Sequence, residues 1–180
     1  MNVSLAPSAI LWLSVLFYLD GKLLLPFFLA AAVHELGHLW VLRRLGHPPA
    51  RIVLRFTGAA MEIPALSYRQ ELLAAAAGPL ASLLLGALLP LFPAFGLYSL
   101  ILGLFNLLPI PGLDGGRILR CAALLALSPD AALRLCRLAA LVSALGLWAL
   151  GLWLALPKGL GLWPLLVAGL FLFKALVMEQ

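Results

Sequence analysis

The sequence predicts an all-α polytopic membrane protein, with about six transmembrane helices and a short membrane-associated β-hairpin between spans two and three. Hydrophobic residues make up 64% of the 180 residues and charged residues 11%, against about 45–50% and about 25% in soluble domains. Repeated apolar runs are long enough to cross a bilayer. The arginines gather in two links between these runs, a pattern typical of membrane topology and not of nucleic-acid binding.

Six apolar segments are expected to form the spans. They cover about residues 3–19, 23–42, 67–92, 96–108, 138–156 and 160–177. The first two are separated by the polar link Asp20-Gly21-Lys22. The third opens at Ser67, which with Gln70 three residues later matches a helix capping box. Small residues recur in it every four positions, at Ala74, Gly78, Ser82 and Gly86. Such a stripe lets another helix approach closely.

Residues 46–66 differ from the spans, because prolines and charged residues make them unsuitable to cross a bilayer. Within them, residues 51–56 are rich in β-branched and aromatic side chains, and residues 59–63 can supply a partner strand across Thr57-Gly58. A short hairpin at the membrane surface, or dipping into it, is therefore expected here.

The second span contains His34-Glu35-Leu36-Gly37-His38. On a helix, histidines four apart lie on one face and can bind the same metal ion, while Glu35 lies about a hundred degrees round the axis. This is the H-E-x-x-H pattern, in which the glutamate acts as general base beside zinc. Ionisable residues inside a membrane are costly and usually functional, so we interpret the three polar side chains as a catalytic site.

A third ligand is needed, because catalytic zinc typically has three protein ligands. The fourth span breaks at residues 106–117, which hold two prolines and three glycines. Irregular backbone at membrane depth is tolerated only when it is buried in protein or lines a water-filled cavity. Asp114 in this break is the best candidate ligand, although an Asp before two glycines can also simply form a turn. For Asn106, a catalytic role and hydrogen bonding to freed backbone groups are equally favoured.

The positions of the basic residues predict the topology. Arginines are concentrated between spans two and three and between spans four and five, so these links are placed in the cytoplasm and both termini with them. His34 then lies nine residues before Arg43, about 13 Å from the cytoplasmic edge. Asp114, three residues before Arg117, lies near the same edge. The expected location is a multi-pass protein of a bacterial cell membrane with its active site near the cytoplasm.

HELGH in an early span, followed by N-x-x-P-x-x-x-x-D-G from Asn106 to Gly115, resembles the site-2 protease family of intramembrane zinc metalloproteases (M50 type). The compact form without a PDZ domain is similar to the branch containing stage IV sporulation protein FB. The segment ELLAAAAGPLAS is similar to the family's A-G-P segment, with Ser82 where many members carry Asn. That departure, like Thr57-Gly58 in place of Gly-Gly, is expected to affect substrate handling and not the metal.

The resemblance implies a role for each polar residue of the site. The zinc ligands would be His34, His38 and Asp114, the catalytic base Glu35, and the group that holds the substrate or its oxyanion Asn106. Residues 1–180 are expected to form a single intramembrane protease domain without a PDZ or CBS domain. It would use Zn²⁺ to cut a membrane-anchored protein substrate within or next to its transmembrane segment, in regulated intramembrane proteolysis.

The expected partners are this substrate and the lipid bilayer, with a regulatory membrane protein as a further candidate and no nucleic acid. Two other functions stay open. A catalytically silent zinc-binding membrane scaffold would need no base beside the metal, so Glu35 argues against it. A small metal transporter would fit intramembrane His and Asp residues, but the sequence contains one adjacent histidine pair and no inverted repeat.

Overall fold

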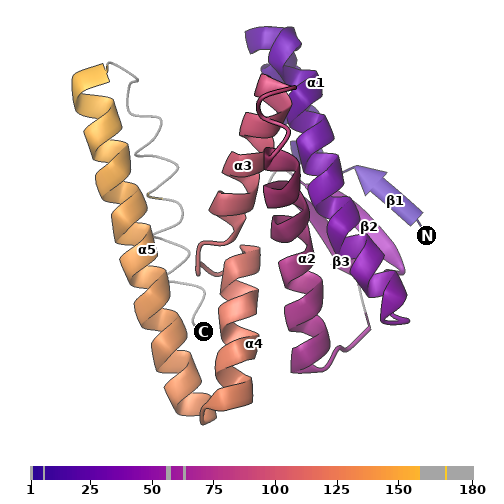
Figure 1. The fold of residues 1–180 in the computed structure, drawn as a ribbon, viewed down its shortest axis with the longest axis vertical. Helices are drawn as coiled ribbons and strands as arrows, with labels where there is room; N and C mark the ends of the chain where they lie inside the picture. Colours follow the sequence, from indigo (N-terminus) through magenta and orange to yellow (C-terminus); the bar gives the residue numbers. More distant parts are fainter. Residues whose placement is uncertain (1, 6, 56–57, 63, 159–168, 170–180) are drawn as a thin grey trace. The chain divides into compact units, whose positions relative to one another are not determined.

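The computed structural model describes residues 2–5, 7–55, 58–62, 64–158 and 169. Its described residues divide into two compact units, one up to Phe105 and one from Asn106 on; Figure 1 labels their helices and strands. In chain order the described elements are β1 (Asn2–Leu5), α1 (Pro7–Arg44), β2 (Arg51–Arg55), β3 (Gly58–Glu62), α2 (Tyr68–Gly86), α3 (Pro93–Asn106), α4 (Asp114–Ala126) and α5 (Pro129–Lys158). The described part is thus mainly helical, as predicted, with one small sheet.

Helix α1 runs without interruption through Asp20 to Lys22, where the sequence predicted a polar link between two spans. That prediction is wrong, because one glycine costs only about 1 kcal/mol in a helix and Asp and Lys are compatible with one. A straight helix of 38 residues would be about 57 Å long. Leu5 nevertheless pairs with Leu54, and the connections from this pair to the ends of α1 reach about 48 Å at most. α1 therefore bends, and Pro26 inside it is a residue type at which helices bend.

The strands form a three-stranded sheet in the order β1-β2-β3. β2 and β3 pair antiparallel, with Arg51 opposite Glu62 and Arg55 opposite Gly58, in agreement with the two strands expected in this segment. Residues 56–57 and 63, also part of that prediction, lie outside the described residues. β1 pairs parallel to β2; it occupies the start of the first predicted span, which is a second error of the prediction. Whether the hairpin contacts the membrane stays a prediction.

Helix α2 packs against α1 and begins as predicted. Ser67 caps it: the Ser67 side chain accepts from the Gln70 backbone N–H, and the Ser67 backbone N–H donates to Gln70 Oε1 at 3.0 Å. The stripe of small residues is buried, as expected; its members are Ala74, Gly78, Ser82 and Gly86. The helix ends at Gly86 and not near residue 92, because Pro90 and Pro93 disfavour helical backbone in the residues before them. Pro93 then opens α3.

Many large apolar side chains of these helices are exposed, whereas most of the buried apolar residues are small. Trp40 is 62% exposed and Leu84 75%, while the buried face of α3 consists of Gly96, Ser99 and Gly103. This distribution is typical of helices packed in lipid, where small residues form the contacts between helices. Two described helical segments, Leu25–Arg44 and Pro129–Trp153, are long and apolar enough to cross a membrane.

The described residues therefore do not establish six spans. α3 has 14 residues, about 21 Å of helix, which is shorter than a bilayer core. α5 starts at Pro129, nine residues before the predicted fifth span, because the expected amphipathic turn is continuous with it. The sixth predicted span falls almost entirely outside the described residues.

The second unit begins with the predicted helix break. After Asn106 the chain leaves the helix, and it turns at Gly112, whose φ of +91° favours glycine. Helix α4 starts at Asp114, one residue before the predicted restart, and packs against α5. A Cβ on Gly115 would clash with the carbonyl oxygen of Leu107, and one on Gly116 with that of Ile110. These glycines let the break fold back against the first turn of α4, and this fixes the position of Asp114.

Candidate metal centre

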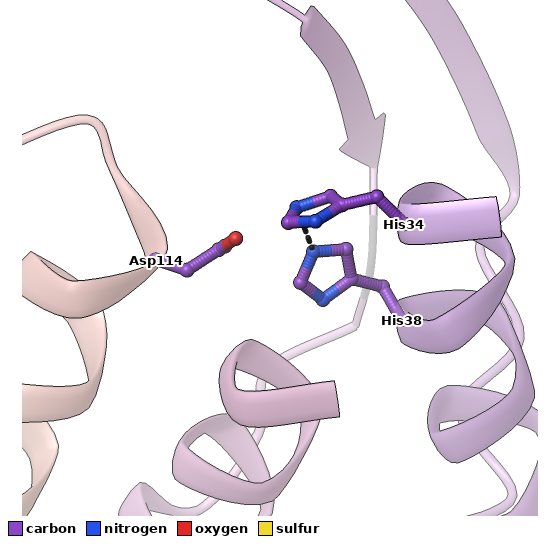
Figure 2. A group of neighbouring side chains, drawn as sticks. All are labelled: His34, His38 and Asp114. Carbon is purple, nitrogen blue, oxygen red and sulfur yellow. Dashed lines mark hydrogen bonds between the residues drawn. The ribbon is translucent and has the colours of Figure 1, made fainter. Parts of the chain in front are cut away.

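His34 and His38 lie on successive turns of α1, and their side chains converge (Figure 2). Both are buried, with 4% and 8% of their surface exposed. Their Nε2 atoms are 3.3 Å apart, and the ring planes are inclined at 78°. Burying a polar nitrogen is costly unless it has a partner, and here the two Nε2 atoms face each other.

The other nitrogen of each ring is held by α2. The Nδ1 of His38 lies 2.7 Å from the carbonyl oxygen of Ala74, and the Nδ1 of His34 lies 2.9 Å from Ser82 Oγ. A carbonyl only accepts, so we assign the proton of His38 to Nδ1 and the lone pair to Nε2. This is the arrangement that metal-binding histidines show, with one nitrogen donating to a supporting group and the other directed at the metal.

Close approach of the two helices makes these contacts possible. A Cβ on Gly78 of α2 would lie 2.1 Å from His38 Nε2, and a Cβ on Gly37 of α1 would lie 2.7 Å from the Ala77 carbonyl oxygen. Any larger side chain at Gly78 would occupy the space of the His38 ring. Two glycines, one on each helix, are therefore required for α2 to reach the backs of the histidines.

The distance between the histidines fits a zinc ion. Two nitrogens that bind one tetrahedral zinc at about 2.0–2.1 Å lie about 3.3–3.4 Å apart, and the two Nε2 atoms are 3.3 Å apart. An N–H···N hydrogen bond would be long at this separation. The donor set, two imidazoles whose Nδ1 atoms have partners, also suits zinc.

The other predicted site residues are placed as follows. Glu35 lies between the two histidines in sequence on α1 and is half-buried. Asn106 is the last residue of α3 and half-buried. Asp114 is in the first turn of α4, where the helix dipole favours a carboxylate; its side chain is also drawn in Figure 2. The histidines with Glu35 belong to the first unit and the other two residues to the second, so the first unit by itself brings together His34 and His38.

Two contacts of the site were not predicted from the sequence. Ser82 was expected to affect substrate handling and not the metal; no expectation was made of its contact with His34, whose Nδ1 lies 2.9 Å from the Ser82 hydroxyl. The support of His38 by a backbone carbonyl has no sequence signal, because every residue has a carbonyl. A signal for Ser82 did exist: it is the polar member of a stripe of small residues on a helix expected to pack closely. His47, in the loop after α1, is half-buried with its Nε2 3.3 Å from Gln70 Nε2.

Comparisons with known proteins point to the same chemistry. Residues 87–143 match the family described as Peptidase family M50. The zinc metalloprotease MJ0392 of Methanocaldococcus jannaschii is 33% identical over 134 residues, which cover 67% of this chain and 37% of that protein. The chain thus matches little more than a third of the length of this curated relative.

A solved structure is similar over the whole chain. The site-2 protease from Methanocaldococcus jannaschii superposes with a TM-score of 0.64 at 25% identity, covering 100% of this chain and 92% of that one. Together with the histidine pair, these similarities make the chain a homologue of the M50 zinc metalloproteases. Within that class, it is a homologue of the site-2 proteases, which agrees with the resemblance seen in its motifs.

Proposed function

We propose that this protein is an intramembrane zinc metalloprotease that hydrolyses a peptide bond within or next to the transmembrane segment of a membrane-anchored protein. The observation that carries the proposal is the pair of Nε2 atoms 3.3 Å apart, each ring supported at Nδ1 by α2. Glu35 lies on the same helix as this pair. A metal-binding scaffold would need the histidines but no carboxylate beside them.

The proposed metal ligands are His34, His38 and Asp114. Each offers one ligand atom, and three protein ligands are typical of catalytic zinc. Asp114 is favoured because the glycines after it let the break pack closely against the first turn of α4. This packing fixes the backbone position from which the Asp114 carboxylate extends. A flexible turn residue would not need this packing.

The proposed mechanism is metal-assisted hydrolysis. Zinc, when bound, activates water and polarises the scissile carbonyl. Glu35 removes the proton of the attacking water and then delivers a proton to the nitrogen of the leaving amine as the C–N bond breaks. The side-chain amide of Asn106 donates a hydrogen bond to the carbonyl oxygen as it becomes negative.

The substrate must be extended before it can be cut, because a transmembrane helix uses its carbonyls in its own hydrogen bonds. Among the described strands, β1 and β3 are the outer ones. Because β1 pairs with the β2 side of the β2–β3 hairpin, the open edge of this hairpin is the outer edge of β3. We therefore place the extended substrate on the outer edge of β3, where it would add a strand.

Proline substitution can test this placement, because N–H groups of successive strand residues point to opposite edges. Of Ala60→Pro and Met61→Pro, one removes an outward N–H and the other an N–H directed at β2. The variant that loses the outward N–H should retain zinc and cleave poorly. If both variants retained zinc and cleaved like the parent protein, substrate addition at β3 would be excluded.

The proposal includes a membrane topology, a branch of the family and a further partner. Arginines at the end of α1 favour a cytoplasmic position for that end, and with it an active site near the cytoplasmic face and cytoplasmic termini. The early HELGH and the downstream N-x-x-P-x-x-x-x-D-G favour the compact branch that contains stage IV sporulation protein FB. A regulatory membrane protein is a further proposed partner.

The test is cleavage by the purified protein reconstituted in liposomes with a single-span substrate. The parent protein should bind one zinc per chain and cleave, whereas Glu35→Gln should bind zinc equally and lose at least about 100-fold in rate, as expected when a general base is removed. Cleavage by Glu35→Gln at the parent rate would refute the protease mechanism. Zinc uptake into the liposomes without cleavage would instead support a transporter.

A further inference from the structure

We propose that Ser82 is a positioning residue for zinc binding: its hydroxyl fixes the ring of His34 so that Nε2 is directed at the metal. This inference rests on the proposed metal site and adds a residue to it. Its basis is the 2.9 Å separation of Ser82 Oγ and His34 Nδ1.

The contact is fully enclosed. Ser82 is 1% exposed and His34 4%, and a Cβ on Gly103 of α3 would lie only 3.1 Å from the Ser82 Cβ. The serine is therefore packed between α1 and α3. In such surroundings the hydrogen bond does not compete with water, and its loss would leave the His34 Nδ1 buried without that partner.

The hydroxyl suits this task chemically. Zinc takes the lone pair of Nε2, so the proton of His34 must lie on Nδ1 in the metal-bound state. Ser82 Oγ can accept a hydrogen bond from that N–H, which is compatible with the tautomer required for binding and restricts rotation of the ring. Alanine at this position could do neither, although it would fit the space.

A matched control exists in the same unit. Ser99 of α3 is 0% exposed, and its Oγ is the one buried side-chain polar atom without a hydrogen-bond partner among the described residues. Ser82→Ala and Ser99→Ala make the same chemical change at equal burial in neighbouring helices. They differ in whether the deleted hydroxyl contacts a histidine.

The experiment measures zinc affinity by competition with a chelator in the purified full chain. Ser82→Ala should weaken zinc binding by about 10–100-fold, as expected for loss of a group that supports a ligand, and should alter the absorption spectrum of the Co²⁺-substituted protein. Ser82→Thr, which keeps the hydroxyl, should restore most of the affinity. Ser99→Ala should match the parent protein in both measurements.

The outcomes separate this inference from the proposed function. If the parent protein bound no zinc, the metal site itself would be wrong. If the parent and Ser82→Ala bound zinc equally and gave the same Co²⁺ spectrum, the positioning role would be excluded while the protease proposal would stand. Should Ser82→Ala not fold, Ser82→Cys provides the comparison, because a thiol of similar size is a weaker acceptor; an unchanged affinity there would also overturn the inference.

Discussion

The two histidines of the site are supported by two different turns of α2. His38 is held by the main-chain carbonyl of Ala74, and His34 by the side-chain hydroxyl of Ser82. The first support exists whenever α2 lies at the right distance from α1, whatever the side chain at position 74. The second exists only if residue 82 carries a suitable acceptor. Substitution can therefore remove the support of His34, whereas the support of His38 depends on how closely the helices pack.

The difference shows how a metal site is built between membrane helices. Small residues bring the helix axes together, and this proximity lets a backbone group serve as a ligand support. Gly78 is the point at which this happens, since the His38 ring occupies the space that a Cβ would need. At His38, a change in the contact between the helices therefore also changes the metal site. At His34, the support can be removed by a substitution that leaves the helix contact in place.

Gly78→Ala should have the largest effect. The new Cβ would lie 2.1 Å from His38 Nε2, so either the ring leaves Ala74 or the helices separate. Zinc affinity should fall by at least about 100-fold, at or beyond the upper end of losses from changes outside the ligands. Competition with a chelator measures this fall, and cleavage of the single-span substrate is measured beside it.

Gly146→Ala is the control for the helical effect of alanine. Gly146 lies in α5, and a Cβ there would meet no described atom within 4 Å. It should bind zinc like the parent and melt slightly higher, because alanine is favoured over glycine in a helix by about 1 kcal/mol. Retention of one zinc per chain by Gly78→Ala would mean that His38 does not bind the metal in the position described.

Features set by local spacing could be predicted from the sequence, whereas contacts between distant segments could not. The HELGH pattern and the break before Asp114 depend on local spacing, as does the cap at Ser67, so all three could be read directly. The contact of Ser82 with His34 depends on the register of α2 against α1, which spacing within one helix does not determine. The pairing of β1 with β2 likewise joins residues about fifty positions apart, and an apolar run at the N-terminus gives no sign of it.

Ala74→Gly should have a much smaller effect on zinc than Ser82→Ala. The substitution removes a buried methyl group but keeps the carbonyl that supports His38. The free energy of unfolding should fall by about 1 kcal/mol, because glycine is less favourable than alanine in a helix by this amount. Zinc affinity should stay within about threefold of the parent, which is less than the usual loss when a supporting group is removed. A loss comparable to that of Ser82→Ala would show that the two supports do not differ as described.

Ser67→Ala should have the smallest effect on the metal site, since it changes α2 about two turns before Ala74. The Ser67 hydroxyl accepts from the Gln70 backbone N–H and donates to Gln70 Oε1, and Gln70 in turn contacts His47. Loss of an N-cap costs about 1 kcal/mol, which should appear as a lower melting temperature. Zinc affinity should not change, because the end of α2 can fray without moving the turns that contact His34 and His38. If zinc binding weakened along with stability, the supports of the histidines would depend on the whole length of α2, and the distinction between its two turns would no longer hold.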